Sequence, residues 1–177
     1  GRGQMNSVQK GRLRKTVWFI NDRVGFMEQV FKDLIRFSNY CDKRELKPAI
    51  RLNGTSDIRF ENIPIHNKTL MEHFPNIQFY DYTKIANRRN IPDNYHLTFS
   101  YSEANPIYQK QVNIALEKKM NIAVVFRHKE NMPKKFLGLK VINGDKNDLR
   151  FLDPKNCVVG LYAKGKAIKD YSGFVID

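Results

Sequence analysis

The sequence predicts an α/β fold with a largely parallel sheet and crossover helices, closed partly or fully into a (β/α) barrel, and with a β-rich C-terminal part. Over residues 22–126, short runs rich in β-branched and aromatic residues alternate with helical patterns. Parallel strands need such crossover connections. The last fifty residues contain strand-like runs with no helix long enough to separate them. With 177 residues, 41% of them hydrophobic, the chain can bury a substantial core.

The first predicted element is a helix that begins after Asp22, a good N-cap residue, and ends near Tyr40. Its predicted core-facing stripe recurs at steps of three and four residues: Val24, Met27, Phe31, Leu34 and Ile35. A short strand over residues 47–52 follows, then a short helix over 67–74. Two more strands are predicted over 77–80 and 95–99, and each runs into a polar segment.

The second half begins with a helix that Asn105 can cap and whose first position suits Pro106. Its predicted buried side is Ile107, Val112, Ala115 and Leu116. A strand over residues 121–126 comes next. Closing strands are predicted over 136–142, 149–152 and 158–162, with polar loops at 143–148 and 163–166.

The net charge is strongly positive, and the distribution of charged residues suggests a domain boundary after residue 16. Lys and Arg number 31 and Asp and Glu 18, so 31 − 18 gives +13. Residues 1–16 contain no acidic residue and are interpreted as a basic arm or the remnant of a longer N-terminal region, with residues 17–177 as a single α/β domain. No apolar run reaches the ~20 residues that span a bilayer, so we expect a soluble protein with no membrane partner. Two cysteines without a CxxC motif fit a reducing compartment, and a cytoplasmic location is expected.

A candidate site follows from the rule that ligands of parallel α/β proteins bind beyond the carboxyl ends of the strands. Three successive strand ends are polar, and we call their residues the rim. Asp57, Asp81 and Ser102 are its candidate catalytic residues, the two carboxylates as acid/base or metal-binding groups. Asn53, Thr55 and Lys84 are candidate ligand-binding residues, with Lys84 holding phosphate. The alternative is that these residues are polar because chains turn there.

Two C-terminal loops extend this hypothesis. Lys164 and Lys166 flank a glycine and are candidate phosphate-binding residues, although a lysine-rich turn also keeps a terminal strand soluble. Asp145, Asp148 and Asp153 could hold Mg²⁺. Alternatively Arg150 neutralises this loop, and its pairing with Asp148 is favoured because the two lie two residues apart on a predicted strand. No metal ligand is therefore assigned, and no cofactor is identified.

Basic residues in several segments predict contacts with a polyanion, whose counterions are released on binding. The candidate nucleic-acid-binding residues are Lys10, Arg12, Arg14, Lys15, Arg88 and Arg89. Nearby aromatic residues could stack bases. The alternative is that the charge serves only solubility.

Several segments together resemble a known family. They are residues 1–5, 8–16, 51–58, 79–84 and 144–154, reading GRGQM, VQKGRLRKT, RLNGTSDI, FYDYTK and GDKNDLRFLDP. These segments resemble the "gene product eighty-eight"-like group of bacteriophage and mobile-element proteins, whose function is unknown. Members of that group carry a cysteine cluster upstream of the segment that matches Gly1–Gly3. The resemblance therefore implies a layout similar to the partial barrel of radical S-adenosylmethionine enzymes.

The functional expectation is a phage-type basic α/β protein that acts on or binds nucleic acid or a nucleotide through the rim. In a phage setting it would work in the host cytoplasm. The alternative is a non-catalytic phage protein that binds nucleic acid or a host protein, as an inhibitor or virion component. The sequence does not decide whether the protein is an enzyme, nor its oligomeric state.

Overall fold

The computed structural model describes residues 5–130 and 132–177. Its internal contacts divide the chain into two compact units. Unit 1 comprises Gly1–Ala49 and Arg59–Gln78, and unit 2 comprises Ile50–Ile58 and Phe79–Asp177. Residues 1–4 of the expected basic arm lie outside the described residues. From Asn6 on, that arm belongs to helix α1 (Asn6–Asn21), which has Met5 as its N-cap and continues past the expected boundary after residue 16.

Unit 1 is built on helices. Helix α2 (Arg23–Asp42) confirms the prediction of a helix capped by Asp22, whose side chain accepts a hydrogen bond from the backbone N–H of Gly25. The stripe is narrower than predicted: Met27, Leu34 and Cys41 are buried, whereas the predicted core residues Val24 and Ile35 are 76% and 41% exposed. Helix α3 (Leu70–His73) is shorter than expected, since its capping box starts it at Thr69. A 3₁₀ helix, η2 (Phe60–Asn62), completes the unit.

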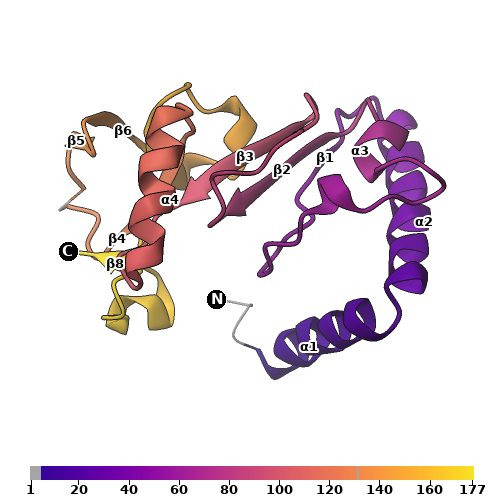
Figure 1. Cartoon of the computed structure of the whole chain (residues 1–177), viewed down its shortest axis with the longest axis horizontal. Helices are drawn as coiled ribbons and strands as arrows, with labels where there is room; N and C mark the ends of the chain where they lie inside the picture. Colours follow the sequence, from indigo (N-terminus) through magenta and orange to yellow (C-terminus); the bar gives the residue numbers. More distant parts are fainter. Residues whose placement is uncertain (1–4, 131) are drawn as a thin grey trace. The chain divides into compact units, whose positions relative to one another are not determined.

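One mostly parallel sheet organises the rest of the chain, which confirms the predicted α/β class (Figure 1). Its strand order is β1-β2-β3-β4-β7-β6-β5, with β8 also paired to β4. The strands are β1 (Ala49–Ile50), β2 (Gln78–Thr83), β3 (Tyr95–Ser100), β4 (Ile122–Phe126), β5 (Lys135–Phe136), β6 (Leu139–Asn143), β7 (Val158–Tyr162) and β8 (Val175–Ile176). The two end strands β1 and β5 do not pair with each other, so the sheet is open and the closed-barrel alternative is wrong.

Helix α4 (Pro106–Glu117) is the crossover between the parallel strands β3 and β4. Asn105 caps it by accepting a hydrogen bond from the backbone N–H of Ile107, as predicted. Val112 and Ala115 are fully buried in the core that also contains Phe99 and Val124. The side chain of Ile107 was also predicted to face the core, but it is 68% exposed because it lies in the first turn, beyond the edge of that contact.

The predicted C-terminal strands are partly corrected. The run over residues 136–142 forms an antiparallel hairpin of β5 and β6, because Leu137 and Gly138 both have positive φ and turn the chain tightly. Residues 149–152 do not form a strand: Arg150–Leu152 is a 3₁₀ helix, η4. Its buried Arg150 guanidinium donates to the carbonyls of Gly144 and Asn147. These contacts curl the segment back on itself, which an extended strand could not do.

Strand β8 shares one side of β4 with β3. Strand β3 pairs with Ile122 and Ala123 of β4, whereas β8 pairs with Val125 and Phe126. Strand β8 therefore continues the sheet where β3 ends. Two further 3₁₀ helices lie in this part of the chain, η3 (Gly144–Lys146) and η5 (Gly165–Lys169).

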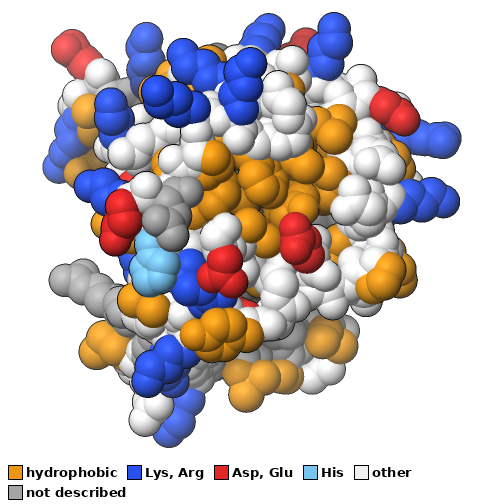
Figure 2. Space-filling model, turned by 90° about the vertical axis from the view of Figure 1, so that its left-hand side faces the viewer, with side chains coloured by type: hydrophobic (Ala, Val, Ile, Leu, Met, Phe, Trp, Pro, Cys, Tyr) orange, Lys and Arg blue, Asp and Glu red, His pale blue; other side chains and the backbone are white. Residues whose placement is uncertain are grey.

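The side of unit 2 that carries the β5–β6 hairpin is apolar in its middle. Figure 2 shows hydrophobic side chains gathered there, with Lys and Arg along the upper border. In the hairpin, the exposed Lys135 and Lys140 are directly opposed cross-strand partners. Like charges on an edge strand discourage edge-to-edge pairing with another chain. Within the described part of the chain, no helix combines the length and apolarity that crossing a membrane requires.

Candidate functional site

The rim lies in unit 2 and begins with a tight loop after β1. Asn53 organises this loop: its Oδ1 accepts hydrogen bonds from the backbone N–H of Ile58 at 2.9 Å and the hydroxyl of Ser56 at 2.8 Å. Its Nδ2 donates to the Ile58 carbonyl at 2.9 Å. Asn53 is buried, whereas Thr55 at the loop tip is exposed. Of the two predicted ligand-binding residues here, Asn53 is therefore used internally and Thr55 faces solvent.

Asp81 lies in the interior and not at a solvent-facing strand end. Strand β2 extends to Thr83, so Asp81 sits within it, and its side chain is fully buried. Its Oδ1 accepts from the backbone N–H of Asn53 at 2.8 Å, and its Oδ2 accepts from Asn53 Nδ2 at 3.1 Å and from the Tyr95 hydroxyl at 2.8 Å. Burial raises the pKa of the Asp81 carboxyl, and these hydrogen bonds oppose that rise. Asp81 thus anchors the loop of Asn53 to β2.

Asp57 holds the C-terminal part of the same loop against the end of β2. Its Oδ2 accepts hydrogen bonds from the Thr83 hydroxyl at 3.0 Å and the backbone N–H of Lys84 at 2.7 Å. Its Oδ1 lies 3.7 Å from the guanidinium of Arg88, whose side chain is 1% exposed and donates to the Ile58 carbonyl at 2.8 Å. Arg88 was predicted to contact nucleic acid, but it is buried in this network.

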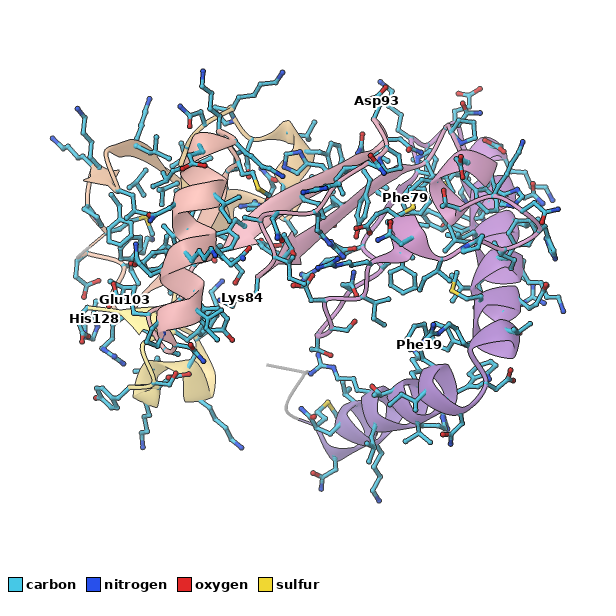
Figure 3. All side chains as sticks on the ribbon, in the orientation of Figure 1. Phe19, Phe79, Lys84, Asp93, Glu103 and His128 are labelled. Atoms are coloured by element: carbon cyan, nitrogen blue, oxygen red, sulfur yellow. The ribbon has the colours of Figure 1, made fainter. Side chains whose placement is uncertain are left out.

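Lys84 is the rim cation, and it is half-buried beside helix α4 (Figure 3). Its Nζ donates to the carbonyls of Ser100 at 2.7 Å and Tyr101 at 2.9 Å. The rings of Tyr108 and Phe174 lie 5.2 and 5.0 Å from the same nitrogen. Burial lowers the pKa of Lys84 to about 8, and the charge of Asp57 acts against this shift. The amine therefore caps the end of β3, with a larger neutral fraction near pH 8 than an exposed lysine would have.

Ser102 is buried after the end of β3. Its hydroxyl donates to the Gly173 carbonyl at 3.4 Å and accepts from the backbone N–H of Ala104 at 3.2 Å. The backbone N–H of Glu103 also donates to the Gly173 carbonyl, at 2.6 Å. Ser102 thus helps to hold the β3 end against the segment that leads into β8.

Internal ion pairs neutralise part of the charge in the two C-terminal loops. Lys164 Nζ lies 2.5 Å from Asp145 Oδ1, and Asp145 Oδ2 accepts from the backbone N–H of Tyr162 at 3.1 Å. Arg150 lies 3.4 Å from Asp153 Oδ2, so the expected pairing of Arg150 with Asp148 is corrected. The reason is the 3₁₀ turn, which puts residues three apart on one side. Lys166 is exposed. In the described ranges, 5–130 and 132–177, no three His, Cys, Asp or Glu side chains gather in a way that could hold a metal ion.

The basic residues of helix α1 form a different surface, in unit 1. Helix α1 has no buried residue and contains neither Asp nor Glu. All four of its predicted nucleic-acid-binding residues are exposed: Lys10, Arg12, Arg14 and Lys15. Arg89 in unit 2 is also exposed. We call the four cations of α1 the basic helix surface.

The structure thus joins some predicted site residues and leaves others apart. Asn53 with Asp81, and Asp57 with Lys84, are directly bonded pairs. Lys164 pairs with Asp145, and the basic helix surface belongs to the other unit. Sequence reasoning missed Tyr95, the third partner in the Asn53–Asp81 cluster. Residues two apart in a strand share one face of the sheet, so Phe79 and Asp81 lie on the same face of β2. The register pairs Phe79 with Tyr95, which puts the Tyr95 hydroxyl within reach of Asp81 on that face. The alternation of residues along β2 is the signal that the sequence contains.

A family model with the description Gene product 88 matches residues 1–177. No curated protein and no solved structure matches the chain.

Proposed function

The chain belongs to the phage-associated Gene product 88 family, and from that premise we propose that it binds nucleic acid through the basic helix surface of α1. The observation that carries the proposal is the exposure of Lys10, Arg12, Arg14 and Lys15 on one helix that lacks carboxylates. A polyanion that meets such a surface releases condensed counterions, which favours binding at low salt.

Binding is a better match to the rim than catalysis. Asp57 and Asp81 each accept at least two internal hydrogen bonds. A general base needs an oxygen within reach of a substrate proton. Both Asp81 oxygens and Asp57 Oδ2 already accept internal hydrogen bonds, and the buried Asp57 Oδ1 lies 3.7 Å from the Arg88 guanidinium. The rim residues therefore support the shape of the loop after β1, whose exposed tip at Thr55 is free to contact a ligand.

The test compares two fourfold variants with equal net charge. The first replaces the basic helix surface: Lys10→Gln, Arg12→Gln, Arg14→Gln and Lys15→Gln. The second replaces four exposed lysines of unit 2: Lys110→Gln, Lys134→Gln, Lys135→Gln and Lys140→Gln. Both lower the formal charge to 13 − 4 = +9. Glutamine forms helices about as well as lysine and arginine, so α1 should persist.

Fluorescence anisotropy of labelled single-stranded and duplex oligonucleotides gives the affinity across a salt series. If all four cations contact phosphates, the slope of log K against log salt should become shallower by about 3 in the α1 variant. The unit 2 variant should keep most of the wild-type slope. An equal loss in both variants would assign binding to net charge alone, and no binding by the wild type at low salt would refute the proposal.

A further inference from the structure

A pocket lies at the C-terminal end of helix α2, within unit 1. Its volume is about 320 Å³, and it is lined by Arg36, Asn39, Tyr40, Lys43 and Arg44. The first four residues follow one another at spacings of three, one and three, so they share one face of the helix end. None of them belongs to the rim or to the basic helix surface.

The lining carries three cations and no carboxylate. Of these cations, Arg36 pairs with Asp33, whose Oδ1 lies 3.2 Å from the guanidinium, and both side chains are more than half exposed. Such an exposed ion pair is weak and leaves Arg36 available to a stronger anion. The end of a helix also favours cations, since its carbonyls carry partial negative charge. Charge alone therefore does not distinguish a ligand site from local stabilisation of α2.

Tyr40 supplies the second observation. This residue is 49% exposed, and the guanidinium of Arg44 lies 4.0 Å from its ring centroid. The Arg44 guanidinium thus lies over the Tyr40 ring, and both groups line the pocket; we call this pair the Tyr40–Arg44 platform. Aromatic rings and guanidinium planes are the groups on which unpaired bases stack, and stacking of this kind tolerates any base. If the Tyr40 ring only stabilised the end of α2 by packing, it would not need to be exposed to solvent.

We propose that this pocket holds one unpaired nucleotide of a single-stranded nucleic acid, with the base stacked on the Tyr40–Arg44 platform; the inference rests on the proposed function. Arg36 and Lys43 contact the phosphates on either side of that nucleotide. The Asn39 amide can both donate and accept a hydrogen bond at the base edge. The pocket thereby adds a preference for single strands to the charge-driven binding of α1.

The matched control is a second tyrosine under an arginine. Tyr171 is 79% exposed, and the guanidinium of Arg127 lies 4.3 Å from its ring centroid. There, however, the guanidinium donates to the carbonyls of Ile168 and Asp170 and pairs with Asp177. The guanidinium beside Tyr171 is therefore held in an internal network, and our proposal places no nucleotide at Tyr171.

The experiment measures binding of a fluorescein-labelled thymidine oligonucleotide, alone and annealed to its complement, by wild type, Tyr40→Leu, Tyr40→Phe and Tyr171→Leu. The expected result is a loss of about tenfold in single-strand affinity for Tyr40→Leu. Tyr40→Phe keeps the ring and should stay within about twofold of wild type. Duplex affinity and the salt slope should not change, because the substitution removes no charge.

A second measurement needs no variant. Irradiation of the wild-type protein with an iodouracil-containing single strand should cross-link the base to Tyr40, as located by mass spectrometry. Equal single-strand binding by Tyr40→Leu and wild type, or a cross-link that avoids Tyr40, would overturn the pocket while leaving α1 binding intact. If the α1 substitutions weaken binding of both oligonucleotides, and Tyr40→Leu weakens binding of the single strand alone, the two surfaces act separately and both proposals stand. No binding of either oligonucleotide by the wild type would overturn both.

Discussion

Removing the Asp81 carboxylate should destabilise unit 2 strongly, although the residue is polar and near a strand end. The change Asp81→Ala deletes the acceptor for the backbone N–H of Asn53, for Asn53 Nδ2 and for the Tyr95 hydroxyl. Of these three donors, Asn53 Nδ2 keeps its bond to the Ile58 carbonyl, and the hydroxyl can rotate. The buried backbone N–H has no such alternative.

The magnitude follows from this difference. One orphaned buried donor costs about 1–3 kcal/mol, and each of the two weakened hydrogen bonds costs about 1 kcal/mol more, so we expect a loss of about 4 kcal/mol in unfolding free energy. In a chain of 177 residues that loss lowers the melting temperature by about 8–16 °C. Asp81→Asn retains one acceptor oxygen and should fall between the alanine variant and wild type.

Thermal unfolding followed by circular dichroism measures the shift, with Asp93→Ala as the control. Asp93 is exposed, and Figure 3 labels it in the loop before β3. Its replacement should change the unfolding free energy by no more than about 0.5 kcal/mol. Amide hydrogen exchange at Ile58 supplies a local readout, since its N–H donates to Asn53 Oδ1 and should exchange faster in Asp81→Ala. If Asp81→Ala melts within ~1 °C of Asp93→Ala, the anchoring role assigned to Asp81 is wrong.

Two other predictions concern the β3 end. Gly173→Ala should cost about 3 kcal/mol, because Gly173 has a φ of +90° and an added Cβ would lie 2.8 Å from the Ala104 nitrogen; Gly54→Ala, with open space around it, is the urea-denaturation control and should stay near wild type. The folded pKa of Lys84, about 8, lies below its ordinary value of 10.5, so unfolding takes up a proton at pH values between the two. Below a pH of about 8 the folded protein bears the cost of burying a charged amine, and this cost is lost as pH rises through that window. Wild type should therefore gain stability relative to Lys84→Met as pH rises from about 8 towards 10, and a difference that stays flat across that range would contradict the shift.

Local signals predicted much of the fold. Asp22 and Asn105 were identified as helix caps from their position before apolar stripes, and both side chains accept the expected backbone hydrogen bond. Capping depends on residues a few positions apart, which a sequence displays directly. The parallel sheet followed in the same way from the alternation of strands and helices.

The site was harder to predict, because its contacts are distant in sequence. Asn53 and Asp81 are 28 residues apart, and Asp57 and Thr83 are 26 apart. Asp81 was interpreted as a strand-end residue, yet β2 continues through it, with Phe79, Asp81 and Thr83 all buried on one face. The alternation of residues 79–83 contained that information, but the burial of a carboxylate depends on donors that only the tertiary structure supplies.

The sharing of β4 between β3 and β8 has a consequence for synthesis. Strand β4, with the sequence Ile-Ala-Val-Val-Phe, is uncharged and β-prone, and it gains β7 only when residues 158–162 exist and β8 only with residues 175–176. During translation, β4 leaves the ribosomal exit tunnel well before β7 and β8 do. Short apolar β-segments with open edges seed aggregation. Nascent or truncated chains that stop between β4 and β7 should accordingly accumulate in inclusion bodies or recruit chaperones.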